Sequence, residues 1–162
     1  MNRPDQSREG IMSDEQFQGN TITLIVPSRS VNIGLARQTI ACLAAQADFT
    51  VDEIDDIKMA VSEAVTNAIV HAYGEAEGPI TIDATLDRHG LRIDVKDQGR
   101  GIPDVPWALE ATNTTQPGEH MGLGFAFIKS LMDEVRIDSQ PGTGTCVQMI
   151  KLFVAARQTP KH

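Results

Sequence analysis

The amino-acid sequence predicts an α+β fold of two layers, in which helices pack against one face of a β-sheet. Two neighbouring segments, 80–86 and 91–95, alternate apolar and polar side chains, which is typical of a hairpin with one face on the core and the other in water. Two further segments, 30–47 and 51–72, repeat apolar residues at helical spacing. A helix of this kind must bury its apolar side against another element, and the half-apolar sheet is its natural partner.

Composition and charge narrow the possible functions. The 162 residues suffice for one domain with a substantial core, and because only 4% are aromatic we expect a core of Val, Ile, Leu, Ala and Met. A net charge of -8 argues against direct nucleic-acid binding and favours protein or metal-nucleotide partners. The sequence shows neither a secretion signal nor a membrane span, and Cys42 and Cys146 are expected to be reduced core thiols in a cytoplasmic protein.

One folded domain is expected over residues 21–153, between a polar, flexible N-terminal extension (1–20) and a short C-terminal tail (154–162). The domain begins with Thr21–Val26, a β-branched alternating segment that is stopped by Pro27. This pattern predicts an edge strand.

Two helices are expected to follow this strand. Ser30 is the candidate N-cap of the first helix. Thr50 and Glu53 have the spacing of a capping box, which predicts the start of the second helix, and Gly74 is expected to end it.

The second helix carries a polar stripe. Glu63, Asn67 and His71 recur every four residues and therefore share one helix face, between apolar neighbours. Asn is a middling helix former, so Asn67 between apolar residues indicates a ligand or a buried network, whereas a solvated helix edge is the plain alternative. The stripe alone leaves both interpretations open.

Three glycine-containing segments lie downstream. Asp97 ends the second strand of the hairpin and precedes Gly99 and Gly101, which fits an ordinary turn or a carboxylate that accepts a hydrogen bond from the amine of a base. After an aperiodic segment, 103–120, that we expect to be a long binding loop, Gly122-x-Gly124 opens a helix that runs to Met132. Two strands, 135–139 and 145–153, are expected to follow, joined by the turn Pro141-Gly142-Thr143-Gly144.

Each of these signals is weak by itself, but their joint order is specific. The segments 62–68, 97–102, 122–125 and 131–135 together resemble the anti-sigma-factor serine kinases of the SpoIIAB and RsbW type, members of the GHKL (Bergerat-fold) ATPases. The resemblance extends over about residues 21–153. It implies a mixed β-sheet covered by helices on a single face, with ATP held between helices and a lid.

The resemblance also assigns roles to residues. Glu63 would be the catalytic general base, and Asn67 would bind Mg²⁺ through its amide oxygen. Asp97 and Thr145 would read the adenine. The full set of residues implied to contact the nucleotide is Asn67, Asp97, Gly99, Gly101, Ile102, Gly122, Leu123, Gly124, Phe125 and Thr145.

Two protein partners are implied by the family: a sigma factor of RNA polymerase that the kinase sequesters, and a STAS-type anti-anti-sigma protein that it phosphorylates. Arg37 matches a partner-facing Arg of the sporulation members, although an exposed, solvated charge explains it equally well. A homodimer is expected on the same grounds.

One position departs from the family pattern. Where the related proteins carry an Arg before Gly-x-Gly, this sequence has His120, so we expect weaker or pH-dependent phosphate contact, or substitution by Arg100 or Lys129. This departure keeps open a non-catalytic, nucleotide-gated binding module. A detached histidine-kinase ATPase domain is a further alternative, disfavoured because no phosphoacceptor helix is recognisable before the first strand.

Overall fold

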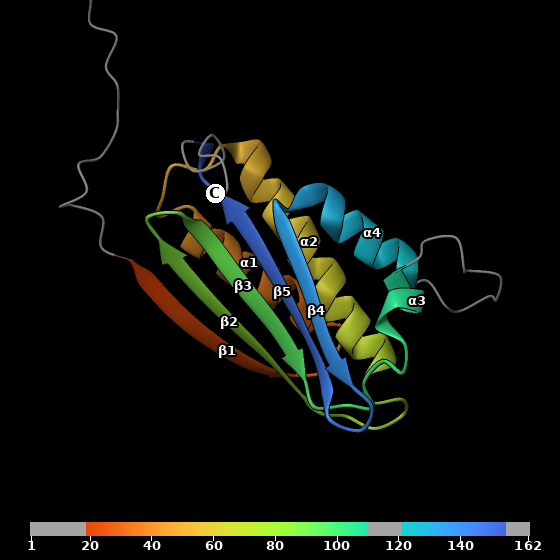
Figure 1. Cartoon of the computed structure of the whole chain (residues 1–162). Helices are drawn as coiled ribbons and strands as arrows, with labels where there is room; N and C mark the ends of the chain where they lie inside the picture. The colour runs from red at the N-terminus through yellow and green to blue at the C-terminus, as the bar shows by residue number, and fades with distance from the viewer. Residues whose placement is uncertain (1–18, 110–120, 155–162) are drawn as a thin grey trace, which may run out of the picture.

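The computed structural model describes residues 19–109 and 121–154, which form a sheet with helices on one face (Figure 1). The elements in chain order are β1 (Asn20–Pro27), α1 (Asn32–Ala44), α2 (Val51–His71), β2 (Pro79–Asp87), β3 (Gly90–Asp97), α3 (Val105–Leu109), α4 (Met121–Leu131), β4 (Glu134–Gln140) and β5 (Gly144–Leu152). The expected α+β two-layer architecture is confirmed. None of the helices in these residues is long and apolar enough to cross a membrane.

The five strands have the order β1-β2-β3-β5-β4, so the first strand lies at a sheet edge as predicted. The expectation of a mixed sheet is wrong, because all four pairings among the described strands are antiparallel. β3 and β4 run in the same direction, but β5 lies between them and runs opposite to both. A parallel contact between β3 and β4 is thereby prevented.

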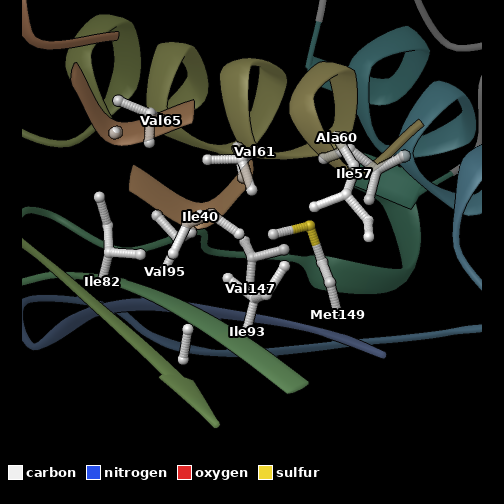
Figure 2. Close-up of a cluster of buried hydrophobic side chains, with 14 of the residues drawn as sticks. Ile40, Ile57, Ala60, Val61, Val65, Ile82, Ile93, Val95, Val147 and Met149 are labelled. Carbon is white, nitrogen blue, oxygen red and sulfur yellow. The ribbon is translucent and has the colours of Figure 1, made fainter. Parts of the chain in front are cut away.

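The core lies between the sheet and the helices and is mainly aliphatic. Figure 2 shows side chains from the helices, among them Ile40, Ile57 and Val61, facing side chains of the sheet. Ile82, Ile93 and Met149 supply the sheet side, and each is fully buried. Burial of one such side chain contributes roughly 1.5–3 kcal/mol. The alternation that predicted the hairpin therefore correctly identified its core-facing residues.

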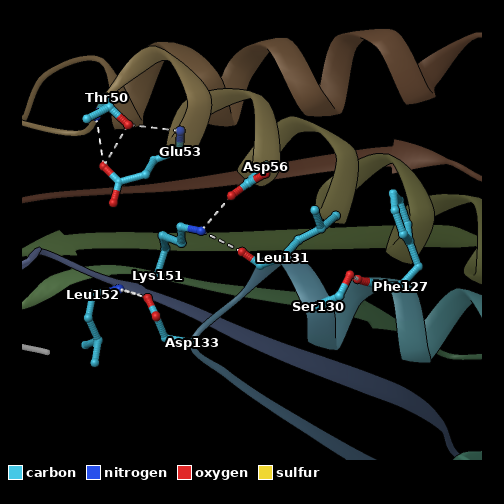
Figure 3. A network of polar contacts seen from close by, with 9 residues as sticks. All are labelled: Thr50, Glu53, Asp56, Phe127, Ser130, Leu131, Asp133, Lys151 and Leu152. Atoms are coloured by element: carbon cyan, nitrogen blue, oxygen red, sulfur yellow. Dashed lines mark hydrogen bonds and ion pairs between the residues drawn. The ribbon is translucent and has the colours of Figure 1, made fainter.

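α2 begins and ends where the sequence predicts. The Thr50 hydroxyl accepts the Glu53 amide at 3.2 Å and Glu53 Oε2 accepts the Thr50 amide at 2.9 Å, so both halves of the capping box are present (Figure 3). At the other end Gly74 adopts φ 62°, a left-handed conformation that favours glycine. α2 packs against both of its neighbouring helices, α1 and α4.

Three predictions outside α2 need correction. Val31, not Ser30, is the N-cap of α1, and no side chain caps this helix. Residues 105–109 of the predicted loop form the short helix α3, while 110–120, including His120, lie outside the described residues. Cys42 is exposed on α1 and Cys146 is half-buried, so Cys42 is not a core thiol.

α4 is fixed at its C-terminal end by a side chain from β5. Lys151 Nζ donates to the Leu131 carbonyl at 2.6 Å and to Asp56 of α2 at 2.9 Å (Figure 3). The neighbouring Asp133 accepts the Leu152 amide at 2.7 Å. Lys151 is only 6% exposed and thus joins α2, α4 and the sheet at one point.

Candidate functional site

One end of the candidate site is built around Asp97, the last residue of β3. Asp97 is paired in the sheet with the buried Ile80, so its side chain points toward the helices. Its Oδ1 accepts the amides of Gly99 at 2.9 Å and Thr145 at 3.2 Å. Burial raises the pKa of Asp97, and the two amide hydrogen bonds offset part of this effect. Because both donors converge on Oδ1, Oδ2 remains available to a hydrogen-bond donor of a ligand.

The glycines after Asp97 allow the chain to pass between α2 and the β4–β5 turn. A Cβ on Gly99 would clash with the carbonyl oxygen of Ala72 at the end of α2. Gly101 has φ 70°, and a Cβ there would clash with the Gln140 carbonyl. The loop is further held by the Arg100 amide, which donates to the Ala72 carbonyl at 2.8 Å. The Asp-x-Gly-x-Gly motif is therefore a tightly packed loop, not a free turn.

A hydroxyl network connects this loop to the last two strands. Ser139 Oγ accepts the amide of Ile102 at 2.8 Å and lies 2.9 Å from Thr145 Oγ1. Ser139 and Thr145 are paired in the β4–β5 register on the helix-facing side. Ser139 is not among the site residues that the sequence predicted. The alternation of β4 could have indicated its inward position, because it puts Ser139 on the same face as the partly buried Ile137.

The other end of the site lies where α2 meets the first turns of α4. A Cβ added to Gly124 would clash with Glu63 Oε1 and would lie 3.1 Å from Asn67 Nδ2. Asn67 Nδ2 is buried and has no hydrogen-bond partner among the described residues. An unsatisfied buried amide is unfavourable by roughly 1–3 kcal/mol, so this position favours a water molecule or a ligand that accepts its hydrogen bond.

The remaining predicted nucleotide residues have different environments. Gly122 lies in the first turn of α4, in sequence close to Gly124. Leu123 is 51% exposed, whereas Phe125 and Ile102 are buried in the core. Phe125 therefore seats α4 on the core and thereby supports the position of Gly124.

The basic residues Arg100, Lys129 and Arg37 lie on separate segments of the described chain. Arg100 Nε donates to the His71 carbonyl at 2.6 Å, so its guanidinium satisfies the C-terminal end of α2 beside the Asp97 loop. That Arg100 replaces a phosphate-binding Arg stays a prediction. Lys129 is exposed in the last turn of α4, and Arg37 is exposed on α1. Both residues therefore lie on other helices than the polar stripe of α2.

A hollow of about 470 Å³ lies mainly on the water-facing side of the sheet. Asp97, Ser139 and Thr145 of the candidate site belong to its lining. Lys96 and Asp83 line it and form a 2.9 Å ion pair. Hydrogen bonds lower the pKa of Asp83, and the bond from Thr23 contributes more than the bond from Lys96. Within residues 19–109 and 121–154, no group of three or more His, Cys, Asp or Glu side chains is placed to hold a metal ion.

The sequence is similar to known proteins over most of its length. Residues 26–151 match the family described as histidine kinase-like ATPase domain. The chain is 43% identical to an anti-sigma F factor of Clostridium acetobutylicum over 135 residues, or 83% of this chain and 94% of the relative. It is 42% identical to the anti-sigma F factor of Bacillus subtilis over 134 residues, or 82% of this chain and 92% of the relative.

Solved structures share the fold at lower sequence identity. A crystal structure of the RsbU and RsbW domains of a Mycobacterium tuberculosis protein has a TM-score of 0.60 and 22% identity, over 82% of this chain and 32% of that one. The histidine kinase domain of a blue-light activated histidine kinase from Erythrobacter litoralis has a TM-score of 0.56 and 24% identity, over 82% of this chain and 64% of that one. The α+β arrangement of sheet and helices is thus common to these proteins.

Proposed function

The chain belongs to the anti-sigma F factors, within the histidine kinase-like ATPase domain family, and on this premise we propose that it is an ATP-dependent protein serine/threonine kinase that sequesters a sigma factor and phosphorylates an anti-anti-sigma protein. The observation that carries the proposal is the contact of Gly124 with Glu63 and Asn67. This contact brings a carboxylate and an amide to the N-terminal turns of α4. The arrangement supplies a candidate general base and a candidate metal ligand for phosphoryl transfer.

The Asp97 end of the site suits an adenine base. Asp97 Oδ1 is occupied by two backbone amides, and its second oxygen is available to accept a hydrogen bond from the amine of the base. Gly99 and Gly101 let the loop after Asp97 pack directly against the backbone of Ala72 and Gln140, which holds the Asp97 carboxylate in place for a base.

The α2–α4 end suits the phosphates. The first amides of a helix have no partner within the helix, so the N-terminus of the eleven-residue α4 favours an anion. Asn67 would hold Mg²⁺ through its amide oxygen, and the unpartnered Nδ2 beside it supports a ligand at this position. The metal ion, when bound, would neutralise phosphate charge. With a single protein ligand, the phosphates would supply much of its coordination.

Glu63 is the candidate general base. It lies one turn before Asn67, and it forms no hydrogen bond or ion pair within the part of the chain that the structure describes. As the substrate hydroxyl oxygen forms its bond to the γ-phosphorus, Glu63 takes the hydroxyl proton, the bond to the β–γ bridging oxygen breaks and ADP leaves. Phosphoserine or phosphothreonine on the partner protein is the expected product.

Partner binding is assigned to a different surface. Arg37 is exposed on α1, which is separated from α4 by α2. A sigma factor can therefore bind at Arg37 without entering the nucleotide site. A homodimer and a cytoplasmic location, which the sequence resemblance implies, are part of the same proposal.

The decisive experiment is phosphate transfer from labelled ATP to the co-purified partner. We expect an acid-stable phosphate on the partner. Glu63→Gln should lower the transfer rate by roughly two to four orders of magnitude while ADP affinity is retained. Glu75→Gln, the same change at an exposed position after α2, should leave both quantities unchanged. An acid-labile phosphate would instead identify a histidine kinase, and ATP binding without any transfer would identify a binding module.

Two further variants separate the metal and partner roles. Asn67→Ala should abolish the Mg²⁺-dependent gain in ATP affinity, and an unchanged gain would contradict the metal role of Asn67. Arg37→Glu should reduce capture of the sigma factor without changing ATP affinity. Arg136→Glu, at an exposed position on the far edge strand β4, is the matched control. Equal capture by both variants would remove Arg37 from the interface.

A further inference from the structure

Lys151 of β5 is a charged side chain on the core-facing side of the sheet. Only 6% of the residue is exposed, and its neighbours on the same face of the strand, Val147 and Met149, are buried apolar residues. A buried ammonium group is unfavourable unless its hydrogen-bond donors are satisfied. Core packing alone would favour an apolar residue at this position, so the reason for a lysine lies in the groups that it contacts.

The Lys151 ammonium joins the two helices that form the phosphate end of the proposed site (Figure 3). Its Nζ donates to Asp56 Oδ2 of α2 at 2.9 Å and to the Leu131 carbonyl of α4 at 2.6 Å. Leu131 is the last residue of α4, where a carbonyl has no partner within the helix. Because this acceptor belongs to the backbone, the bond fixes the position of the helix itself and not only that of a side chain.

The Lys151 bridge and the contact of Gly124 with Glu63 are two points of one interface. Asp56 lies seven residues before Glu63 on α2, and Leu131 lies seven residues after Gly124 on α4. The two helices therefore run antiparallel here, and on each of them the bridge lies about 10 Å, or two turns, from the contact. Because the spacing is equal on both helices, a bridge held at one point sets which residues meet at the other.

The position of α4 along α2 decides what Glu63 faces. In the observed register a glycine lies against it, and even a Cβ at position 124 would clash with Glu63 Oε1. A slide of α4 along α2 would move Gly124 away and bring the large side chains of the next turn, Phe127 and Ile128, toward the carboxylate. The polar stripe therefore keeps its environment in one register only.

We propose that Lys151 is a positioning residue for the proposed site: its ammonium group holds α2 and α4 in the register that places Gly124 against Glu63 and Asn67. The inference rests on the proposed function for its catalytic consequence, since the aligned groups are the candidate general base and metal ligand. What it adds is a residue of β5, two turns away, that controls their alignment. Small misplacements of reacting groups are costly, so loss of the bridge should lower the rate of phosphate transfer more than the affinity for ADP.

The kinetic test removes either half of the bridge. In the folded full chain, Lys151→Met should lower kcat for phosphate transfer by about ten- to a hundredfold and change the Kd for ADP by less than about threefold. Asp56→Ala, which removes only the acceptor on α2, should also lower kcat, and this milder variant decides the test where Lys151→Met does not fold. Asp55→Ala is its matched control and should leave kcat unchanged, because Asp55 pairs with Lys58 within α2.

A second control separates positioning from a general loss of stability. Val26→Ala removes buried apolar atoms from β1, the edge strand farthest from β4, and should lower the Tm without lowering kcat in the folded state. If Val26→Ala lowers kcat as much as Lys151→Met does, the inference is overturned. Transfer at the wild-type rate by folded Lys151→Met overturns it as well.

An unfolding measurement tests the register without any phosphate transfer. A methyl group on Gly124 is strained only while α4 keeps its register against Glu63, so Gly124→Ala should shift the urea midpoint less favourably in the wild type than in a Lys151→Met background. Gly34→Ala, whose Cβ would meet no atom within 4 Å, is the control and should shift the midpoint equally in both. Equal shifts by Gly124→Ala in the two backgrounds would show that Lys151 does not set the register.

These outcomes are distinct from failure of the proposed function. A wild-type protein that transfers no phosphate contradicts the kinase, and the unfolding comparison still decides the role of Lys151. A wild-type protein that transfers phosphate, but in which Gly124→Ala and Lys151→Met act additively on unfolding, overturns the role of Lys151 and leaves the kinase standing.

Discussion

Gly124 of α4 packs so closely on Glu63 of α2 that a methyl group at position 124 would collide with the Glu63 carboxylate. The same methyl group would also lie 3.1 Å from Asn67 Nδ2, which is tighter than ordinary van der Waals contact. Glycine is an unfavourable residue inside a helix by about 1 kcal/mol relative to alanine. Its presence here indicates that contact with the polar stripe outweighs helix propensity.

Gly124→Ala should therefore impair the site while it leaves the fold intact. The added methyl group must displace Glu63, Asn67 or α4 itself. Because small misplacements at a reacting centre are costly, we expect phosphate transfer to fall by roughly a hundredfold. Transfer assays and thermal unfolding of the same preparation measure the two effects.

Gly34→Ala is the matched control for this substitution. Gly34 lies in α1, and a Cβ there would meet no atom within 4 Å. The change should leave transfer unaffected and raise stability by up to about 1 kcal/mol through helix propensity. If both variants transfer phosphate at the wild-type rate, the contact of Gly124 with Glu63 has no catalytic importance.

Asp97→Asn should weaken ADP binding by roughly ten- to a hundredfold, because a hydrogen bond to a charged acceptor is lost. The asparagine Oδ1 can still accept the amides of Gly99 and Thr145, so the loop keeps its internal contacts. Calorimetric titration with ADP measures the loss. Unchanged affinity would show that Asp97 does not contact the base.

The same variant should be more stable than the wild type without nucleotide at neutral pH. Burial raises the pKa of Asp97 above its ordinary value of 3.8, so ionisation at neutral pH destabilises the folded state. Below pH 3.8 the carboxyl is protonated in both states and the penalty is absent. As the pH rises through the raised pKa, the unfolded chain loses its proton first and the penalty develops fully. The Tm difference between variant and wild type should therefore be smallest in acid and largest near neutrality, and a difference that grows toward acid would contradict this sign.

Lys151→Met should destabilise the fold by about 1–3 kcal/mol, because it removes the donor that joins Asp56 and the Leu131 carbonyl in a nearly buried position. Lys58→Met is the control, since the Lys58–Asp55 pair has the similar length of 2.8 Å but is exposed, and its loss should cost less than about 0.5 kcal/mol. Urea unfolding compares the two. Equal destabilisation would show that burial adds nothing to the Lys151 bridge.

The sequence predicted the elements whose signals are local. The capping box of Thr50 and Glu53, the hairpin alternation and the end of α2 before Gly74 depend on residues close in the chain, and all three are confirmed. The polar stripe was correctly assigned to one helix. Its contact with Gly124 could not be predicted, because Gly124 is distant in sequence and meets Glu63 only through the packing of α4 on α2.

The errors and omissions have non-local causes. The sheet is antiparallel because β5 enters between β3 and β4, a pairing that no local pattern encodes. Ser139 became relevant only when the β4–β5 register placed it beside Thr145. Lys151 lies on the core-facing side of β5, as Val147 and Met149 do. The alternation of β5 therefore indicates that Lys151 is buried, although this was not among the predictions.

The position of β5 has a consequence for the order of folding. β5 is the last of the described strands, yet it lies inside the sheet and pairs with both β3 and β4. During synthesis, Asp97 therefore cannot accept the Thr145 amide until residues 144–152 have left the ribosome. β4 likewise pairs with β5 only from that point on. Because the Thr145 amide donates to Asp97, the Asp97 end of the proposed site is complete only after this insertion.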